Sequence, residues 1–135
     1  MAFQLSDDIL DVASESAQSG KAPGTDLREG VQSLPVLHAL APPVAGPPAA
    51  GPPAAGPPVA GDARLRELLS QGGLTDDSEH AEALALLRAH PAMDAARADL
   101  RRWADAARSE IAGLPGIPAR RAFEIMCDFV VERTS

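Results

Sequence analysis

A run of twenty residues, 42–61, contains only alanine, proline, glycine and valine, and it holds eight of the 13 prolines in the chain. Within it, Ala-Gly-Pro-Pro followed by Ala or Val occurs three times at five-residue spacing, whereas collagen needs glycine at every third position. Proline pairs favour an extended polyproline II backbone, and the intervening glycines loosen it. We therefore predict a disordered Pro/Ala/Gly-rich loop, which separates two patterned segments, residues 1–41 and 62–135.

Composition excludes several classes of protein. The remaining residues, about 115, suffice for one modest domain and not for two. The lone cysteine, Cys127, excludes a disulfide scaffold and favours a reducing, cytoplasmic location, while His38, His80 and His90 lack metal-ligand spacing and are expected at the surface or at helix ends. No apolar run reaches about 18 residues, so we expect no membrane span. The net charge of −7 argues against a nucleic-acid-binding surface.

Residues 62–135 carry apolar side chains at helical spacing throughout. We expect four helices here. The first is capped by Asp62, the second by Thr75, the third runs from about 93 to 112, and the fourth starts at Pro118. The side chains expected to be buried on them are Leu65, Leu68, Leu69, Ala83, Leu84, Leu87, Leu100, Trp103, Ala107, Ile111, Phe123, Met126, Cys127 and Val130. Because no segment alternates Val, Ile and Thr as a strand pair does, we predict an all-α fold.

The amino-terminal run, residues 3–11, reads Phe-Gln-Leu-Ser-Asp-Asp-Ile-Leu-Asp. At about 100° per residue, a helix here would present Asp7, Asp8 and Asp11 within about one turn of its surface. Its apolar side chains fall on the opposite side: Leu5, Ile9, Val12 and Ala13. Like charges at this spacing repel, and a hard divalent cation such as Mg²⁺ would relieve the repulsion. The spacing alone favours a solvated acidic face over a metal site.

The next patterned run, residues 20–37, reads Gly-Lys-Ala-Pro-Gly-Thr-Asp-Leu-Arg-Glu-Gly followed by Val-Gln-Ser-Leu-Pro-Val-Leu. Its glycines permit tight backbone near a ligand, and Lys21 supplies a point charge suited to phosphate. Ser33 can cap a helix that has Pro35 in its first turn. This run therefore predicts a loop suited to an anion, followed by a helix.

Together the two runs resemble the trans-type polyprenyl (isoprenyl) diphosphate synthases. The acidic run matches the family's second Asp-rich motif, and residues 20–35 match the segment that follows it in the family's order and spacing. The resemblance implies the C-terminal part of an isoprenoid-synthase-type helical bundle. Residues 1–41 would hold the motif helix and the diphosphate-closing segment, residues 42–61 a low-complexity loop, and residues 62–135 the C-terminal helices of the same domain.

The resemblance also implies an activity and a set of site residues. Members condense an allylic diphosphate with isopentenyl diphosphate, and Mg²⁺ bridges the allylic diphosphate to two Asp-rich helices. By this resemblance Asp7, Asp8 and Asp11 bind metal, and no residue is assigned a catalytic role. The residues implied in substrate binding are Phe3, Gln4, Lys21 and Asp26.

The sequence departs from the family pattern in two places. Val31 stands where many members carry a second lysine, and nothing in residues 12–135 supplies the Asp-Asp-x-x-Asp of the family's first motif. We therefore expect a truncated C-terminal fragment that is inactive alone. The alternatives are a non-catalytic accessory subunit and an interaction module built on the proline-rich run. A homodimer and completion by another chain are both compatible with the resemblance.

Overall fold

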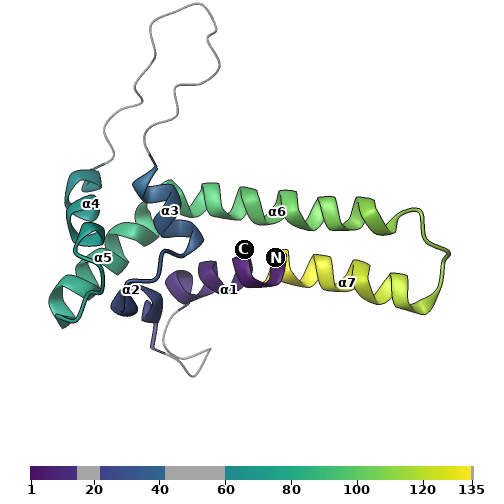
Figure 1. The fold of residues 1–135 in the computed structure, drawn as a ribbon, viewed down its shortest axis with the longest axis horizontal. Coiled ribbons are helices and arrows are strands. Elements are labelled where there is room, and N and C mark those ends of the chain that lie inside the picture. The colour runs from purple at the N-terminus through teal and green to yellow at the C-terminus, as the bar shows by residue number, and fades with distance from the viewer. Residues whose placement is uncertain (15–21, 42–59, 135) are drawn as a thin grey trace, which may run out of the picture.

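The computed structural model describes residues 1–14, 22–41 and 60–134. The helices in these ranges are α1 (Ala2–Ala13), α2 (Thr25–Glu29), α3 (Leu34–Leu40), α4 (Asp62–Ser70), α5 (Asp77–Ala89), α6 (Ala92–Ile111) and α7 (Pro118–Glu132) (Figure 1). No strand occurs in these ranges, which confirms the predicted all-α class. Lys21 and the predicted loop, except residues 60 and 61, lie outside the described residues.

The two longest helices, α6 and α7, run antiparallel and form a hairpin (Figure 1). α1 lies end to end with α7, so that the first and last helices of the chain meet beside the middle of α6. Helices α2, α3, α4 and α5 gather at the end of the molecule away from the α6–α7 turn (Figure 1). Contacts of α6 with α7, α3 and α1 join these parts.

α1 buries the face that its periodicity predicts. Ile9 and Val12 are fully buried, and Leu5 and Ala13 pack against the same core. The core draws on every other helix as well, through side chains that include Leu27, Val36, Leu65, Leu87, Leu100 and Val130. The opposite, acidic face of α1 is consequently held in a fixed orientation by apolar burial on its back.

α6 packs in a different helical phase from the predicted one. The predicted stripe holds for Leu100, which is fully buried, but Trp103 is 49% exposed and Ala107 is also exposed. The buried stripe is instead Met93, Ala96, Leu100 and Ala104. Small side chains at two of these positions let neighbouring helices approach α6 closely, so close packing rather than side-chain size sets the phase.

α7 is less buried than predicted. Val130 is buried and Cys127 is half-buried, but Phe123 and Met126 are each about half exposed. Together with Trp103 and the α6–α7 turn, they belong to an apolar surface that we call the hairpin face: Trp103, Leu114, Ile117, Phe123, Ile125, Met126 and Phe129. Among the described residues, none of the helices combines the length and apolar character needed to cross a membrane.

Two predicted helix starts are displaced by one residue. Asp76, not Thr75, is the N-cap of α5, and its carboxylate accepts the backbone N–H groups of Ser78 at 2.9 Å and Glu79 at 3.0 Å. The Ser78 hydroxyl also donates to this carboxylate, and these bonds hold the pKa of Asp76 below its usual value. A charged acceptor is stronger than a hydroxyl, which explains why the cap moves to the aspartate.

α4 begins at Asp62 and takes Gly61, with φ +84°, as its N-cap. Asp62 therefore does not cap the helix; its carboxylate accepts from Arg66 Nε at 3.0 Å and contacts His90 Nε2 at 3.2 Å. The hydrogen bond from Arg66, aided by His90, keeps the pKa of Asp62 low. Arg66 Nη1 and Nη2 also donate to the carbonyls of Leu40 and Ala41, each at 3.0 Å. Arg66 thus joins the end of α3 to the start of α4.

The phase of α6 can be tested by two truncations. Leu100→Ala should lower the free energy of unfolding by about 2–5 kcal/mol, because it empties a fully buried site. Trp103→Ala should cost less than half as much although it removes a larger side chain, since half of that side chain is already in water. Urea denaturation followed by circular dichroism measures both. A larger loss for Trp103→Ala would contradict the observed phase.

Candidate functional site

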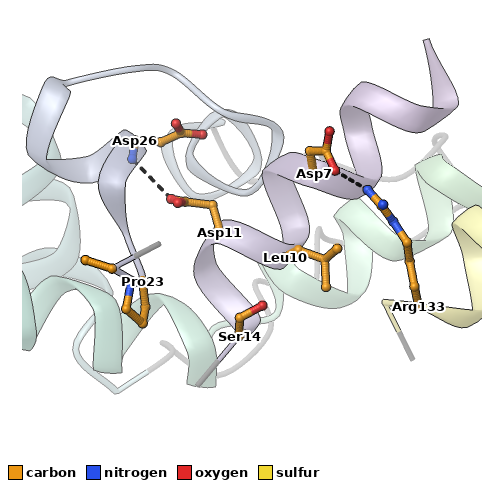
Figure 2. A pocket seen from close by; sticks show the side chains of 8 residues that line it. Asp7, Leu10, Asp11, Ser14, Pro23, Asp26 and Arg133 are labelled. Carbon is orange, nitrogen blue, oxygen red and sulfur yellow. Dashed lines mark hydrogen bonds and ion pairs between the residues drawn. The ribbon is translucent and has the colours of Figure 1, made fainter. Parts of the chain in front are cut away.

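A pocket of about 340 Å³ lies beside the acidic face of α1 (Figure 2). It is lined by Asp7, Leu10, Asp11, Ser14, Ala22, Pro23, Asp26 and Arg133. Two of the predicted metal-binding residues and one predicted substrate-binding residue therefore meet at one cavity: Asp7, Asp11 and Asp26. Arg133 arrives from the far end of the chain, and sequence analysis did not identify it.

Asp11 joins α1 to α2. Its Oδ1 accepts the backbone N–H of Thr25 and its Oδ2 that of Asp26, each at 3.1 Å, and its carbonyl accepts the N–H of Gly24 at 2.8 Å. The first N–H groups of a helix have no partner within the helix, and the positive end of the helix attracts a carboxylate. Asp11 therefore acts as the cap of α2 from a different helix, and this places Asp26 at the pocket.

Asp8 joins α1 to α3 in the same way. Its Oδ2 accepts the backbone N–H of Leu34, the first residue of α3, at 3.0 Å. Ser33 occupies the N-cap position as predicted, but its buried hydroxyl has no hydrogen-bond partner in the described part of the chain. The predicted capping by the Ser33 side chain is therefore wrong. Pro35 lies in the first turn of α3, where the sequence places it.

Asp7 is the exposed member of the acidic motif, and it forms an ion pair with Arg133 (Figure 2). Arg133 Nε also donates to the Ser6 hydroxyl at 3.0 Å. Its guanidinium carbon lies 4.6 Å from the centroid of the Phe3 ring and 5.6 Å from that of Phe129. These contacts join the end of the chain to the start of α1 across 126 positions.

The other predicted substrate-binding residues do not all meet at the pocket. Phe3 and Gln4 are exposed on the first turns of α1, and Phe3 reaches the site through its contact with Arg133. Lys21 lies outside the described residues. The acidic motif thus divides into Asp7 and Asp11 at the pocket and Asp8 at the start of α3.

α5 supports the pocket from behind through two side chains. Arg88 donates from Nε to the Val12 carbonyl and from Nη2 to the Ser14 carbonyl, each at 2.7 Å, at the end of α1. His80 Nε2 donates to the Gly24 carbonyl at 2.8 Å, just before α2. His80 lies in the first turn of α5, which is one of the two predicted placements, but at 6% exposure it is not a surface residue. Both bonds end on backbone carbonyls, which have no sequence signature, and periodicity could not have identified them.

Two glycines set the position of α2. Gly30, at the end of α2, has φ +71°, and a Cβ there would lie 2.8 Å from the backbone nitrogen of Gly73. A Cβ on Gly73 would lie 2.5 Å from the carbonyl oxygen of Arg28, and the N–H of Leu74 donates to the Leu27 carbonyl at 3.0 Å. The tight backbone expected near a ligand is here a close approach of the chain to itself.

The carboxylates suit a partly hydrated cation better than an enclosed one. Mg²⁺ prefers oxygen ligands, keeps several waters, and commonly takes one or two protein carboxylates together with phosphate oxygens. Asp7 and Asp11 offer this donor type at an open pocket. Within the described ranges, no three His, Cys, Asp or Glu side chains are grouped closely enough to hold a metal ion. The donors fit an ion shared with an anionic ligand.

Fold and site together define an all-α protein with a carboxylate-lined pocket at the junction of an acidic helix and a glycine-bounded segment. The Polyprenyl synthetase family model matches residues 1–45. Nonaprenyl diphosphate synthase of Mycobacterium tuberculosis is 48% identical over 98% of this chain and 35% of its own length. Heptaprenyl diphosphate synthase component 2 of Geobacillus stearothermophilus is 29% identical over 98% of this chain and 36% of its own.

Geranylgeranyl pyrophosphate synthase of Corynebacterium glutamicum, solved with calcium and isoprenyl diphosphate, superposes with a TM-score of 0.77 at 36% identity. The alignment covers 99% of this chain and 36% of that one. The chain is similar to polyprenyl diphosphate synthases over nearly its whole length, and its helical fold is the isoprenoid-synthase type that the sequence predicts. It spans about a third of the length of the curated relatives it matches.

Removing the Asp11 carboxylate should loosen α2 without affecting α7. We expect Asp11→Ala to lower the free energy of unfolding by about 1–2 kcal/mol, because it leaves two helix N–H groups without their acceptor. Hydrogen exchange at the Thr25 and Asp26 amides should accelerate. Asp7→Asn is the control on the same face and should leave these two amides protected. Equal exchange in both variants would contradict the capping role.

Gly30 and Gly72 form a matched pair for the close approach of α2. Both have positive φ, +71° and +85°, but a Cβ at Gly72 would have no atom within 4 Å. Gly72→Ala should cost about 1–2 kcal/mol from backbone conformation alone. Gly30→Ala should cost at least about 1 kcal/mol more, because its methyl would press on the Gly73 backbone. Thermal unfolding compares the two, and equal losses would refute the packing argument.

Proposed function

We propose that the pocket beside α1 binds a diphosphate through Mg²⁺, as part of a prenyl diphosphate synthase that condenses an allylic diphosphate with isopentenyl diphosphate. The observation that carries the proposal is the meeting of Asp7, Asp11 and Asp26 at one open pocket. The match of residues 1–45 to the Polyprenyl synthetase family model and the similarity to a nonaprenyl diphosphate synthase support it. The solved relative from Corynebacterium glutamicum, which holds calcium and isoprenyl diphosphate, supports the pairing of cation and ligand.

The three aspartates of the acidic motif have different roles in binding. Asp7 and Asp11 would contact the metal, because both line the pocket, whereas Asp8 would keep α3 in register with α1. When bound, Mg²⁺ would act as a Lewis acid that stabilises the departing diphosphate. Lys21 would add fixed positive charge near the phosphates, as the sequence motif suggests.

The remaining residues position this segment. Asp26 lines the pocket and lies in the first turn of α2, the helix that Asp11 caps. His80 and Arg88 hold the backbone on either side of residues 15–21, at Gly24 and at Val12 and Ser14. Phe3 and Gln4 would border the substrate at the exposed first turns of α1. This division predicts that loss of Asp7 weakens ligand binding with little change in the fold.

A second candidate is a subunit completed by a separately encoded chain. The likeness to a relative named as component 2 of a heptaprenyl diphosphate synthase favours it. So does the hairpin face, because exposed large apolar side chains gathered on one helical hairpin are typical of a protein interface. Co-purification with a chain that carries the first Asp-rich motif would select this candidate over a homodimer.

Calorimetric titration of the 135-residue chain with inorganic pyrophosphate tests the proposal. Pyrophosphate should bind with Mg²⁺ present and should not bind measurably in EDTA. Asp7→Asn should weaken Mg²⁺-dependent binding by about tenfold, because a charged ligand to the metal is lost. Glu110→Gln, an exposed site on α6, is the charge-matched control and should bind as the wild type does.

The same chain should show no prenyl transfer with an allylic diphosphate and radiolabelled isopentenyl diphosphate, because its sequence carries a single Asp-Asp-x-x-Asp motif. Binding equal in EDTA and Mg²⁺, or unaffected by Asp7→Asn, would overturn the proposed site. Turnover above background would overturn the expected inactivity alone.

A further inference from the structure

Arg133 is held beside the acidic motif from several directions. Its side chain is only 18% exposed, and it contacts the Asp7 carboxylate, the Ser6 hydroxyl and the Phe3 ring, all on α1. The ring of Phe129, one turn earlier in the chain, lies on another side at 5.6 Å. An exposed ion pair alone is weakly oriented, but an arginine that also stacks on aromatic rings is fixed in place.

Among the described residues that line the pocket, Arg133 supplies the positive charge and Asp7, Asp11 and Asp26 the negative charge. Arg88, on α5, is engaged with backbone carbonyls instead. Like charges at Asp7 and Asp11 repel, so a nearby cation stabilises the motif. In this structure the Arg133 guanidinium offsets that repulsion at Asp7.

We propose that Arg133 is the resident counter-ion of the acidic motif and competes with the divalent cation for Asp7. This inference rests on the proposed function, since it assumes that Asp7 binds the metal. A metal ion that takes Asp7 displaces the guanidinium from the carboxylate, while Ser6 and the two aromatic rings keep the side chain nearby. Arg133 is therefore a positioning residue, which sets how tightly the motif binds cations.

The competition has a reciprocal consequence. If the metal weakens the contact between Arg133 and Asp7, then that contact weakens metal binding by the same factor. Removing the guanidinium should tighten metal binding, whereas a purely structural residue would weaken it or leave it unchanged when removed. The direction of the change therefore distinguishes the two roles.

Electron paramagnetic resonance of free Mn²⁺ measures metal affinity in the 135-residue chain. Arg133→Gln should bind Mn²⁺ about three- to tenfold more tightly than the wild type, because a competing charge is removed. Arg133→Lys keeps the charge and should remain near the wild-type value. Arg97→Gln is the matched control: Arg97 holds the Thr134 carbonyl at 2.9 Å, next to Arg133, and pairs with Asp94 on α6. It should leave Mn²⁺ affinity unchanged.

A double-mutant cycle shows whether the effect passes through Asp7. In an Asp7→Asn background, Arg133→Gln should change Mn²⁺ affinity by less than about twofold. Unchanged or weaker binding by Arg133→Gln, or the same gain in the Asp7→Asn background, would overturn the competition and leave the proposed function intact. A complete absence of Mn²⁺ binding in every variant, with pyrophosphate present, would overturn both.

Discussion

The carboxylate of Asp11 accepts the backbone N–H groups of Thr25 and Asp26, and these two bonds join the two segments that line most of the pocket. They fix α2 against α1, and the neighbouring bond from Leu34 to Asp8 fixes α3. Apolar burial of Ile9 and Val12 orients the helix from which both carboxylates project. Helix α1 therefore positions α2 and α3 through the carboxylates on one face. Its opposite face packs into the core.

Three aspartates within about one helical turn are tolerated because each has its own source of positive potential. Asp11 and Asp8 meet the amino-terminal ends of α2 and α3, and Asp7 meets the Arg133 guanidinium. The helix ends belong to the folded framework, whereas the arginine side chain can be exchanged for another cation. Asp8 and Asp11 thus have partners fixed by the fold, and Asp7 has a partner that can be replaced.

Local periodicity sufficed for much of the fold and for part of the site. The buried face of α1, the run Ala83, Leu84 and Leu87 on α5, and the absence of strands in the described residues follow from patterns within one or two turns. The pocket residue Arg133 did not emerge, because its partners on α1 lie more than 120 positions away and nothing local marks it. The exposed Trp103 shows the converse limit: a helix with two apolar stripes does not reveal which one packs.

Arg66 binds the last carbonyls of α3 while its neighbour Asp62 opens α4, so the two ends of segment 42–59 are joined by a contact between folded elements. Once those ends are fixed, the entropy of closing the intervening chain rises only with the logarithm of its length, about 0.6 kcal/mol for each doubling. Gain or loss of one Ala-Gly-Pro-Pro repeat would therefore be nearly neutral for folding. The folded part of the chain therefore places little thermodynamic constraint on the number of repeats.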